Sequence, residues 1–134
     1  MKRIATALVT RTGPDYAQSV TTGGFELLSD EPVAAGGGNA GPAPYGLVLA
    51  GLGSCTAITL KMYADRKGWD IGTMQVSLTL EQDAAGSIHI ARMLATDVAL
   101  EDAQWDKLIE IAGKTPVTKT LQAGATITAA RARS

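Results

Sequence analysis

The chain has 134 residues, with 12 lysines and arginines against 13 aspartates and glutamates, and a formal net charge of -1. This length fits a single domain, residues 1–134, that can bury a core without metals or disulfides. The balanced charge gives no basic field of the kind that binds nucleic acid. One cysteine cannot form an internal disulfide, and a lone thiol fits a reducing compartment, so we expect a cytoplasmic protein.

The N-terminal part of the chain predicts a small antiparallel sheet. Residues 3–11 and 16–22 are rich in Ile, Val, Thr and Tyr, and a turn cluster at 12–15 separates them, which is typical of a hairpin. A third short strand is expected over residues 25–29. At least three strands therefore precede the first helix.

A glycine-rich loop and a long apolar helix follow. The loop GGGNAG, residues 36–41, lacks the Lys-Ser/Thr pair of a phosphate-binding loop and predicts a flexible lid or a turn. Residues 45–67 contain no proline and, up to Lys61, are apolar on nearly every side, which is typical of a buried helix. Since the loop takes the first half of the uncharged stretch, we expect the helix to be too short to cross a bilayer and expect no membrane association.

The glycines of this helix carry two further expectations. Gly46, Gly51 and Gly53 are unfavourable in a helix interior and suggest that another element approaches closely. A break at residues 51–53 is an open alternative, in which Ser54 caps a new helix and Cys55 lies in its first turn.

The second half predicts a hairpin followed by helices. Residues 74–81 alternate between apolar and polar, and a second strand is expected over 88–100. A helix begins at 101–102 and ends near Gly113, a short helical turn covers 116–121, and a final strand covers 125–130. The order of elements is that of an α+β fold, with antiparallel sheets around a buried central helix. A lone subunit has few aromatic residues to cover such a helix, so we expect a homodimer.

Cys55 is the main candidate for chemistry. Its reactive form would be the thiolate, which needs a nearby positive charge or a helix N-terminus. An unreactive cysteine that packs as a small hydrophobe is the competing interpretation. The only histidine, His89, is far from it in sequence, so we expect neither a metal site nor another cofactor. The candidate cations for the thiolate are Lys61, Arg66, Lys114 and Lys119.

Two segments carry a resemblance to a known family. The run GGGNAGPAPYGLVLAGLGSCTAITLKMYADRKGW resembles the central segment of the OsmC/Ohr family, the osmotically inducible and organic hydroperoxide resistance proteins. There a glycine-rich loop and a proline lead into the helix that bears the peroxidatic cysteine. The run IEIAGKTPVTKTL resembles the second helix of that family and the segment after it. The resemblance implies an OsmC-like fold, an intertwined homodimer with sites at its interface, and peroxiredoxin-like thiol peroxidase activity in the oxidative stress response.

The chain departs from the family pattern near the predicted site. Cys55 matches the peroxidatic cysteine, but the second cysteine, directly before the Pro-Val pair, is replaced by Thr115. Thr118 stands where many relatives have histidine. A hydroxyl cannot resolve a sulfenic acid, so this member lacks the usual route of turnover.

Two other family positions are also changed. The glutamate at the start of the helix is absent, and Tyr45 and Gly46 occupy the candidate positions, which we take as substrate-binding. The glycine-rich part of the N-terminal sheet has no arginine, and Arg11 is the candidate substitute.

Three hypotheses follow. In the first, Cys55 alone reduces or senses organic hydroperoxides, and an external thiol reduces it. In the second, a catalytically degenerate dimer binds a small apolar ligand in its interface cleft, and Cys55 only lines that cleft. In the third, the chain is a structural or interaction domain. The first predicts a reactive thiol, the second an inert thiol beside an apolar pocket, and the third neither.

Overall fold

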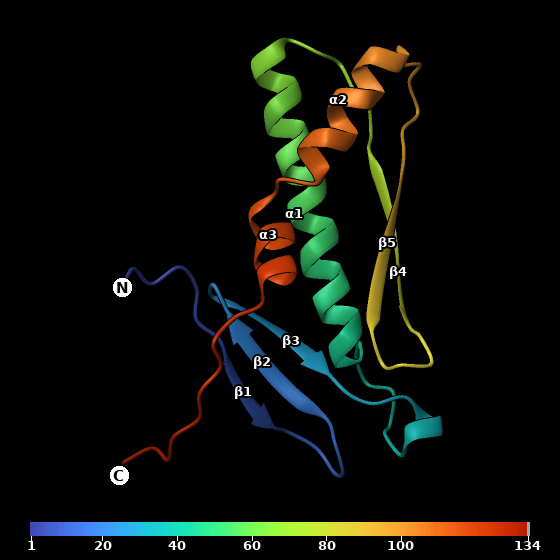
Figure 1. Ribbon diagram of the computed structural model, residues 1–134. Helices are drawn as coiled ribbons and strands as arrows, with labels where there is room; N and C mark the ends of the chain where they lie inside the picture. Colours follow the sequence, from blue (N-terminus) through green and yellow to red (C-terminus); the bar gives the residue numbers. More distant parts are fainter. Residues whose placement is uncertain (134) are drawn as a thin grey trace. The chain divides into compact units, whose positions relative to one another are not determined.

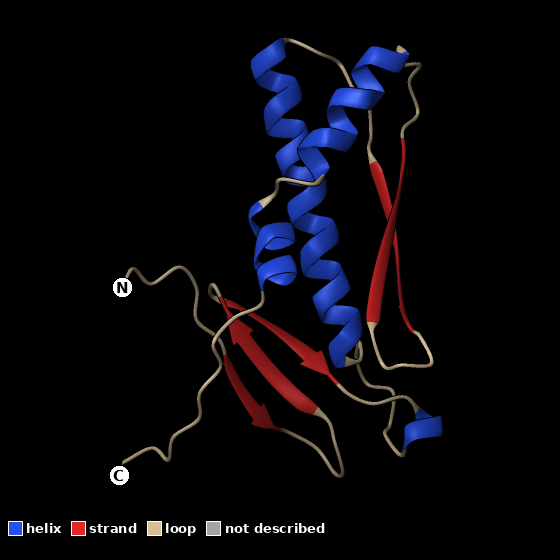
Figure 2. Cartoon of the chain, viewed as in Figure 1, coloured by secondary structure: helices blue, strands red, loops and turns tan. Residues whose placement is uncertain are grey.

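The computed structural model describes residues 1–133 (Figures 1 and 2). The chain forms two compact units, Met1–Val48 and the part from Leu49 onward. Small antiparallel sheets and three α-helices make up a mixed architecture, in agreement with the predicted α+β class. The assignment of all residues to a single domain stays a prediction.

The first unit contains a three-stranded antiparallel sheet in the order β1-β2-β3. Its strands are β1 (Leu8–Arg11), β2 (Gln18–Thr22) and β3 (Phe25–Ser29). Val20 of β2 lies between Val9 of β1 and Leu27 of β3. The predicted hairpin and third strand are confirmed, although β1 begins later than expected.

The glycine-rich loop is a turn fixed by the carboxylate of Asp30, whose side chain is 4% exposed. This carboxylate accepts hydrogen bonds from the backbone N–H groups of Glu31 at 2.7 Å, Ala40 at 3.1 Å and Gly38 at 3.2 Å. A Cβ at Gly37 would collide with the carbonyl of Glu31, so glycine is required where the loop crosses the chain. Of the two predicted roles, turn and lid, this arrangement supports the turn.

Helix α1 runs without interruption from Pro44 to Lys67. The alternative of a break at residues 51–53 is therefore wrong, and Cys55 lies in the interior of the helix instead of its first turn. The prediction that the helix is too short to cross a bilayer is also wrong, because its 24 residues are sufficient by length and composition. Leu60 and Ala64 are nevertheless fully buried in a protein core, as in the central helix of a soluble protein.

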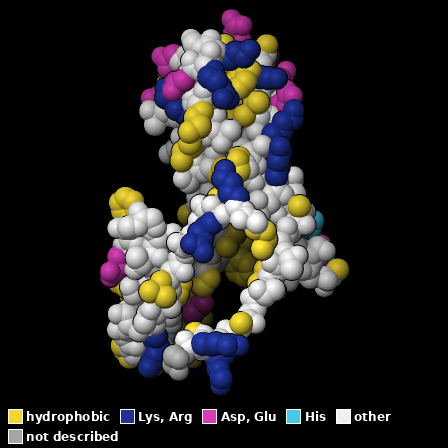
Figure 3. Space-filling model, turned by 90° about the vertical axis from the view of Figure 1, so that its left-hand side faces the viewer, with side chains coloured by type: hydrophobic (Ala, Val, Ile, Leu, Met, Phe, Trp, Pro, Cys, Tyr) yellow, Lys and Arg dark blue, Asp and Glu magenta, His cyan; other side chains and the backbone are white. Residues whose placement is uncertain are grey.

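Burial along α1 is confined to one stripe in the single chain. Residues at helical spacing are buried, namely Leu52, Gly53, Thr56, Leu60 and Ala64. Other apolar side chains of the helix are exposed, including Val48 at 40%, Ile58 at 52% and Met62 at 58%. Exposed apolar side chains, some beside lysine and arginine, are visible on the face that Figure 3 presents. One chain therefore leaves part of the helix uncovered. This agrees with the expectation that a lone subunit cannot cover the helix on all sides.

The second unit packs a hairpin and two helices against α1 (Figure 1). Strands β4 (Gln75–Gln82) and β5 (Ile88–Ala95) form the predicted antiparallel hairpin. Helix α2 (Asp102–Ala112) begins with a capping box between Glu101 and Gln104, and α3 (Pro116–Ala123) follows after a short connection. The core of this unit consists of Leu60, Ala64, Ile71, Leu108 and Ala112.

The predicted final strand is wrong for this structure. Residues 124–133 form neither helix nor strand, and Ile127 in their middle is 88% exposed. A strand needs a neighbouring edge to satisfy its backbone hydrogen bonds. Among residues 1–133, no strand pairs with this segment.

Candidate functional site

Cys55 lies in the interior of α1 and faces the start of α3. Its side chain is partly buried. Burial raises the pKa of the Cys55 thiol, but hydrogen bonds from the Val117 backbone N–H and from the hydroxyls of Thr115 and Thr59 lower it, as does the charge of Arg92. The net result is a pKa below the ordinary cysteine value. This setting favours the thiolate, the nucleophilic form of cysteine.

The start of α3 supplies donors because the first N–H groups of a helix have no partner within it. Thr115 is the N-cap residue, and its hydroxyl oxygen accepts a hydrogen bond from the Thr118 N–H at 3.2 Å. Pro116 occupies the first helical position, where its missing N–H costs nothing. The next N–H, that of Val117, points toward the Cys55 sulfur and lowers the pKa of the thiol. The Cys55 sulfur thus lies at the positive end of the α3 dipole, although it is not at the start of its own helix.

Arg92 on β5 is the cation of the site. Its Nη1 atom donates to Thr118 Oγ1 at 2.9 Å and to Thr56 Oγ1 and the Ala112 carbonyl at 3.0 Å each. These three acceptors belong to α3, α1 and α2 in turn. One guanidinium therefore ties together the helices around Cys55, and its charge lowers the pKa of the thiol.

Arg92 was not among the cations predicted from the sequence, and the four predicted cations do not have this role. Lys61 forms a surface ion pair with Asp65 at 2.7 Å, and Lys114 forms one with Glu110 at 3.1 Å. Arg66 and Lys119 are exposed, and the charge that lowers the pKa of Cys55 is that of Arg92. A signal for Arg92 was present, because it lies in phase with Ile90 and Leu94 on the inward face of an alternating strand.

The structure brings Cys55, Thr115 and Thr118 together, as the family pattern implied. Thr115 is fully buried and Thr118 is 4% exposed, and their hydroxyl oxygens are 2.7 Å apart. Tyr45 and Gly46 lie in the first turn of α1, where the Tyr45 side chain is 65% exposed. Arg11 is exposed at the end of β1 in the first unit. The roles assigned to Tyr45, Gly46 and Arg11 stay predictions.

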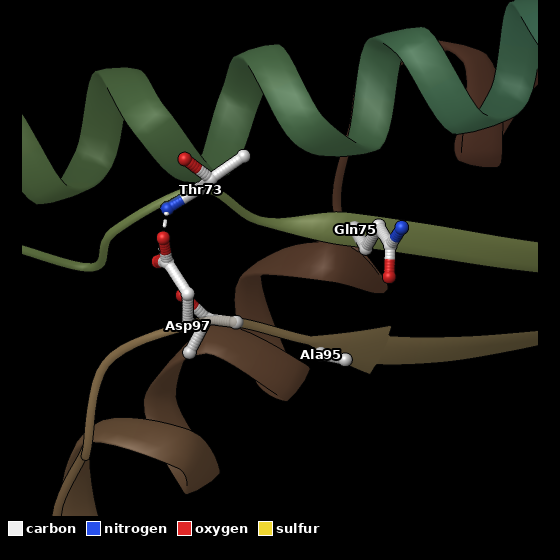
Figure 4. A pocket seen from close by; sticks show the side chains of 5 residues that line it. Thr73, Gln75, Ala95 and Asp97 are labelled. Carbon is white, nitrogen blue, oxygen red and sulfur yellow. Dashed lines mark hydrogen bonds between the residues drawn. The ribbon is translucent and has the colours of Figure 1, made fainter.

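A separate hollow lies at the end of the β4–β5 hairpin (Figure 4). It has a volume of about 360 Å³, and the Asp97 carboxylate at its edge accepts the Thr73 N–H at 2.8 Å. Ala95 in its wall is three residues from Arg92, so the two point to opposite faces of the strand. The hollow is therefore not part of the Cys55 site. It is lined by Thr73, Gln75, Ala95, Thr96 and Asp97.

Several solved structures have a fold similar to that of this chain. A protein of Psychrobacter arcticus, provisionally assigned to the osmotic stress and detoxification response, is 22% identical with a TM-score of 0.73, and the match covers 90% of each chain. An OsmC-like protein of Mycoplasma pneumoniae is 18% identical with a TM-score of 0.72, covering 91% of this chain and 89% of that one. The organic hydroperoxide resistance protein OhrB of Bacillus subtilis is 23% identical with a TM-score of 0.60, covering 90% and 91%.

These identities establish a shared fold and nothing finer. No curated protein sequence matches the chain significantly. The family model described as OsmC-like protein matches residues 36–130, a segment that includes the glycine-rich loop, Cys55, Arg92 and both threonines of the site. The chain therefore belongs to the OsmC-like protein family.

Proposed function

We propose that this protein reduces organic hydroperoxides through Cys55 alone, as a one-cysteine thiol peroxidase of the oxidative stress response. The observation that carries the proposal is the setting of Cys55, which is partly accessible and has a lowered thiol pKa. An inert core cysteine has no need of donors and a cation around its sulfur. Similar structures that bear the name organic hydroperoxide resistance protein support the choice of substrate class.

The reaction proceeds in two stages. The Cys55 thiolate attacks the terminal oxygen of the hydroperoxide, the S–O bond forms as the O–O bond breaks, and the alkoxide takes up a proton and leaves as an alcohol. Cys55 is now a sulfenic acid. An external thiol attacks its sulfur, water leaves, and a mixed disulfide forms. A second external thiol then attacks the external sulfur of the mixed disulfide. This releases Cys55, and the two external thiols leave joined as a disulfide.

The external thiol is needed because Thr115 cannot act as the resolving residue. Its oxygen neighbours the Cys55 sulfur, but a hydroxyl does not form a disulfide with a sulfenic acid. Cys55 is the single cysteine of the chain, so no other residue can take this part. The reductant must therefore be a small thiol or the exposed thiol of another protein.

We further propose that the protein works as a homodimer in the cytoplasm. Support for the dimer comes from Val48, Ile58 and Met62, which are large apolar side chains exposed on α1 in the single chain. Tyr45, Gly46 and Arg11 are the proposed contacts to the substrate, and the exposure of the Tyr45 ring is compatible with such a contact. Light scattering coupled to gel filtration tests the dimer, and a raised KM of Tyr45→Ala for the hydroperoxide tests the contact.

The decisive experiment is intact mass spectrometry. The reduced protein is treated with cumene hydroperoxide and a sulfenic-acid trap, with Cys55→Ser as control. A rapid adduct that depends on Cys55 supports the enzyme. An unmodified thiol at a large excess of hydroperoxide refutes it and favours the alternative, in which the dimer binds a small apolar ligand.

A further inference from the structure

Within the described chain, the guanidinium of Arg92 donates hydrogen bonds from only one of its nitrogen atoms. Both hydrogens of Nη1 are taken up by Thr118 Oγ1 at 2.9 Å and by Thr56 Oγ1 and the Ala112 carbonyl at 3.0 Å each. Nη2 and Nε donate to no acceptor among residues 1–133. The guanidinium therefore has a second edge, formed by Nη2 and Nε, whose N–H groups the protein leaves unused. We call it the open edge.

The open edge is in contact with solvent. Arg92 is half-buried. Among the described side chains that are buried or half-buried, every nitrogen or oxygen atom shielded from solvent has a hydrogen-bond partner. Since Nη2 and Nε have none in this part of the chain, both must touch solvent. A molecule from outside can therefore reach these two donors.

The charge and shape of the open edge suit a carboxylate. None of the ion pairs among residues 1–133 includes Arg92, so no carboxylate of the described chain neutralises it. The N–H groups of Nη2 and Nε lie in one plane and point in nearly the same direction, which matches the two oxygens of a carboxylate. Such a pair is stronger than a hydrogen bond between neutral groups.

The guanidinium lies next to the residues that surround Cys55. Thr56, which accepts from Nη1, directly follows Cys55 on α1, and consecutive Cα atoms are about 3.8 Å apart. Thr118, the second hydroxyl acceptor, is 2.7 Å from Thr115 Oγ1 at the start of α3, the helix end that Cys55 faces. Arg92 and Cys55 therefore lie against the same first turn of α3.

The charge of Cys55 changes during the proposed reaction. In the first stage Cys55 is a thiolate, and a second anion at Arg92 would be repelled by it, so this stage suits a neutral hydroperoxide. Once Cys55 is a sulfenic acid, the thiolate charge has been consumed. An anion can then approach the guanidinium without this repulsion. The stage in which a carboxylate fits is the reduction by the external thiol.

We propose that the open edge of Arg92 binds the carboxylate of a small carboxylated thiol, which is the reductant of oxidised Cys55. This inference deepens the proposed function and rests on it for the reduction step. With the carboxylate held by Nη2 and Nε, the thiolate of the reductant attacks the Cys55 sulfur, the S–S bond forms as the S–O bond breaks, and the hydroxide takes up a proton and leaves as water. Arg92 then determines which thiols reduce the protein.

The test uses the full-length protein and no hydroperoxide. Dithiodipyridine converts Cys55 to a neutral mixed disulfide, which lacks the thiolate charge as the sulfenic acid does. The rate at which thiopyridone is released is then measured with β-mercaptopropionate and with its methyl ester, which differ in the carboxylate. We define the preference as the ratio of these two rates. The preference of wild type should exceed that of Arg92→Gln about tenfold.

Two further variants separate the open edge from a general effect of charge. Arg92→Lys keeps the charge but has no planar pair of donors, so it should retain only part of the preference. Lys119→Gln removes the same charge from an exposed position on α3 and should leave the preference unchanged. Because each preference compares two thiols on one protein, a variant that slows both thiols equally does not alter it.

A measurement on wild type alone complements the variants. Propionate has the carboxylate but no thiol, so it should slow the reaction of β-mercaptopropionate and leave that of the methyl ester unchanged at matched ionic strength. If the Arg92 variants do not fold, this competition decides the question.

The outcomes distinguish the binding site from the proposed function. An equal preference in wild type and Arg92→Gln, or the absence of competition by propionate, overturns the carboxylate site. A preference that depends on Arg92, in a protein that hydroperoxide does not oxidise, refutes the proposed function and leaves the site. Oxidation of Cys55 by hydroperoxide without any such preference refutes the site and leaves the proposed function.

Discussion

Gly53 sets the distance between α1 and the strand pair that carries Arg92. A Cβ placed on Gly53 would lie 2.7 Å from Leu78 Cδ1, closer than carbon atoms can approach. Leu78 is directly opposite Arg92 in the β4–β5 ladder. Gly53→Ala should therefore press on the hairpin at the level of the arginine. The close approach predicted from the glycines of this helix is confirmed at Gly53, whereas Gly51 has nothing within 4 Å in the single chain.

The expected energies follow from two opposing effects. Replacing glycine by alanine inside a helix stabilises it by about 1 kcal/mol. At Gly53 the new methyl group must also displace the end of Leu78, and such overpacking costs about 1–3 kcal/mol. Gly51→Ala should thus gain about 1 kcal/mol, and Gly53→Ala should be less stable than Gly51→Ala by about 1–3 kcal/mol.

Urea unfolding of both variants measures this difference, and a double-mutant cycle with Leu78→Ala shows whether the two side chains interact. Equal stabilisation by both alanines, with no coupling to Leu78, would refute the reasoning. A loss of stability at Gly51 that depends on protein concentration would show a second copy packed against that position.

Three other changes should give measurable effects. Leu60→Ala removes a fully buried side chain and should cost about 2–5 kcal/mol in urea unfolding, whereas Met62→Ala, at a side chain exposed in the single chain, should cost much less in the dissociated monomer. The pKa of Cys55 is lowered in the folded state, so ionisation of the thiol should stabilise wild type relative to Cys55→Ser. This pH-dependent difference in the free energy of unfolding should be largest above the ordinary cysteine pKa and should be lost as the pH falls through the folded pKa. A difference between the two proteins that does not change with pH would contradict this. The N–H groups of Ala40 and Glu31 lower the pKa of Asp30, so acid should destabilise wild type more steeply than Asp30→Asn as the pH falls below about 4.

The elements of the fold were predictable where the sequence pattern is local. Alternation identified β4, and the acidic pair Glu101 and Asp102 identified the start of α2, because burial on one face and acidic residues at a helix N-terminus leave signals within a few residues. The final strand over residues 125–130 was wrong because a strand depends on a partner edge, which the local pattern does not contain. The supposed break at residues 51–53 failed for a similar reason, since Gly53 is explained by Leu78 and not by a helix end.

The candidate site was predictable in part. Cys55, Thr115 and Thr118 were found through the family motifs around them. The cation was sought among residues close in sequence to Cys55 or to the Pro-Val pair. Arg92 is 37 positions away from Cys55 along the chain, and the hairpin brings it back. Its inward phase between Ile90 and Leu94 could have identified it, because a charged residue on the apolar face of a strand needs partners inside the protein.

The partners of Arg92 also bear on the charge of Cys55. A half-buried guanidinium loses hydration, and a carboxylate normally compensates for this loss. Among residues 1–133, no carboxylate forms an ion pair with Arg92, and the acceptors of its hydrogen bonds are two hydroxyls and one carbonyl, all neutral. The charge of Arg92 lowers the pKa of Cys55, so ionisation of this thiol would supply a negative charge near the guanidinium. Since the thiolate has a favourable interaction with this cation and the neutral thiol does not, the fold that half-buries Arg92 also favours the reactive form of the cysteine, and it does so without a second cysteine.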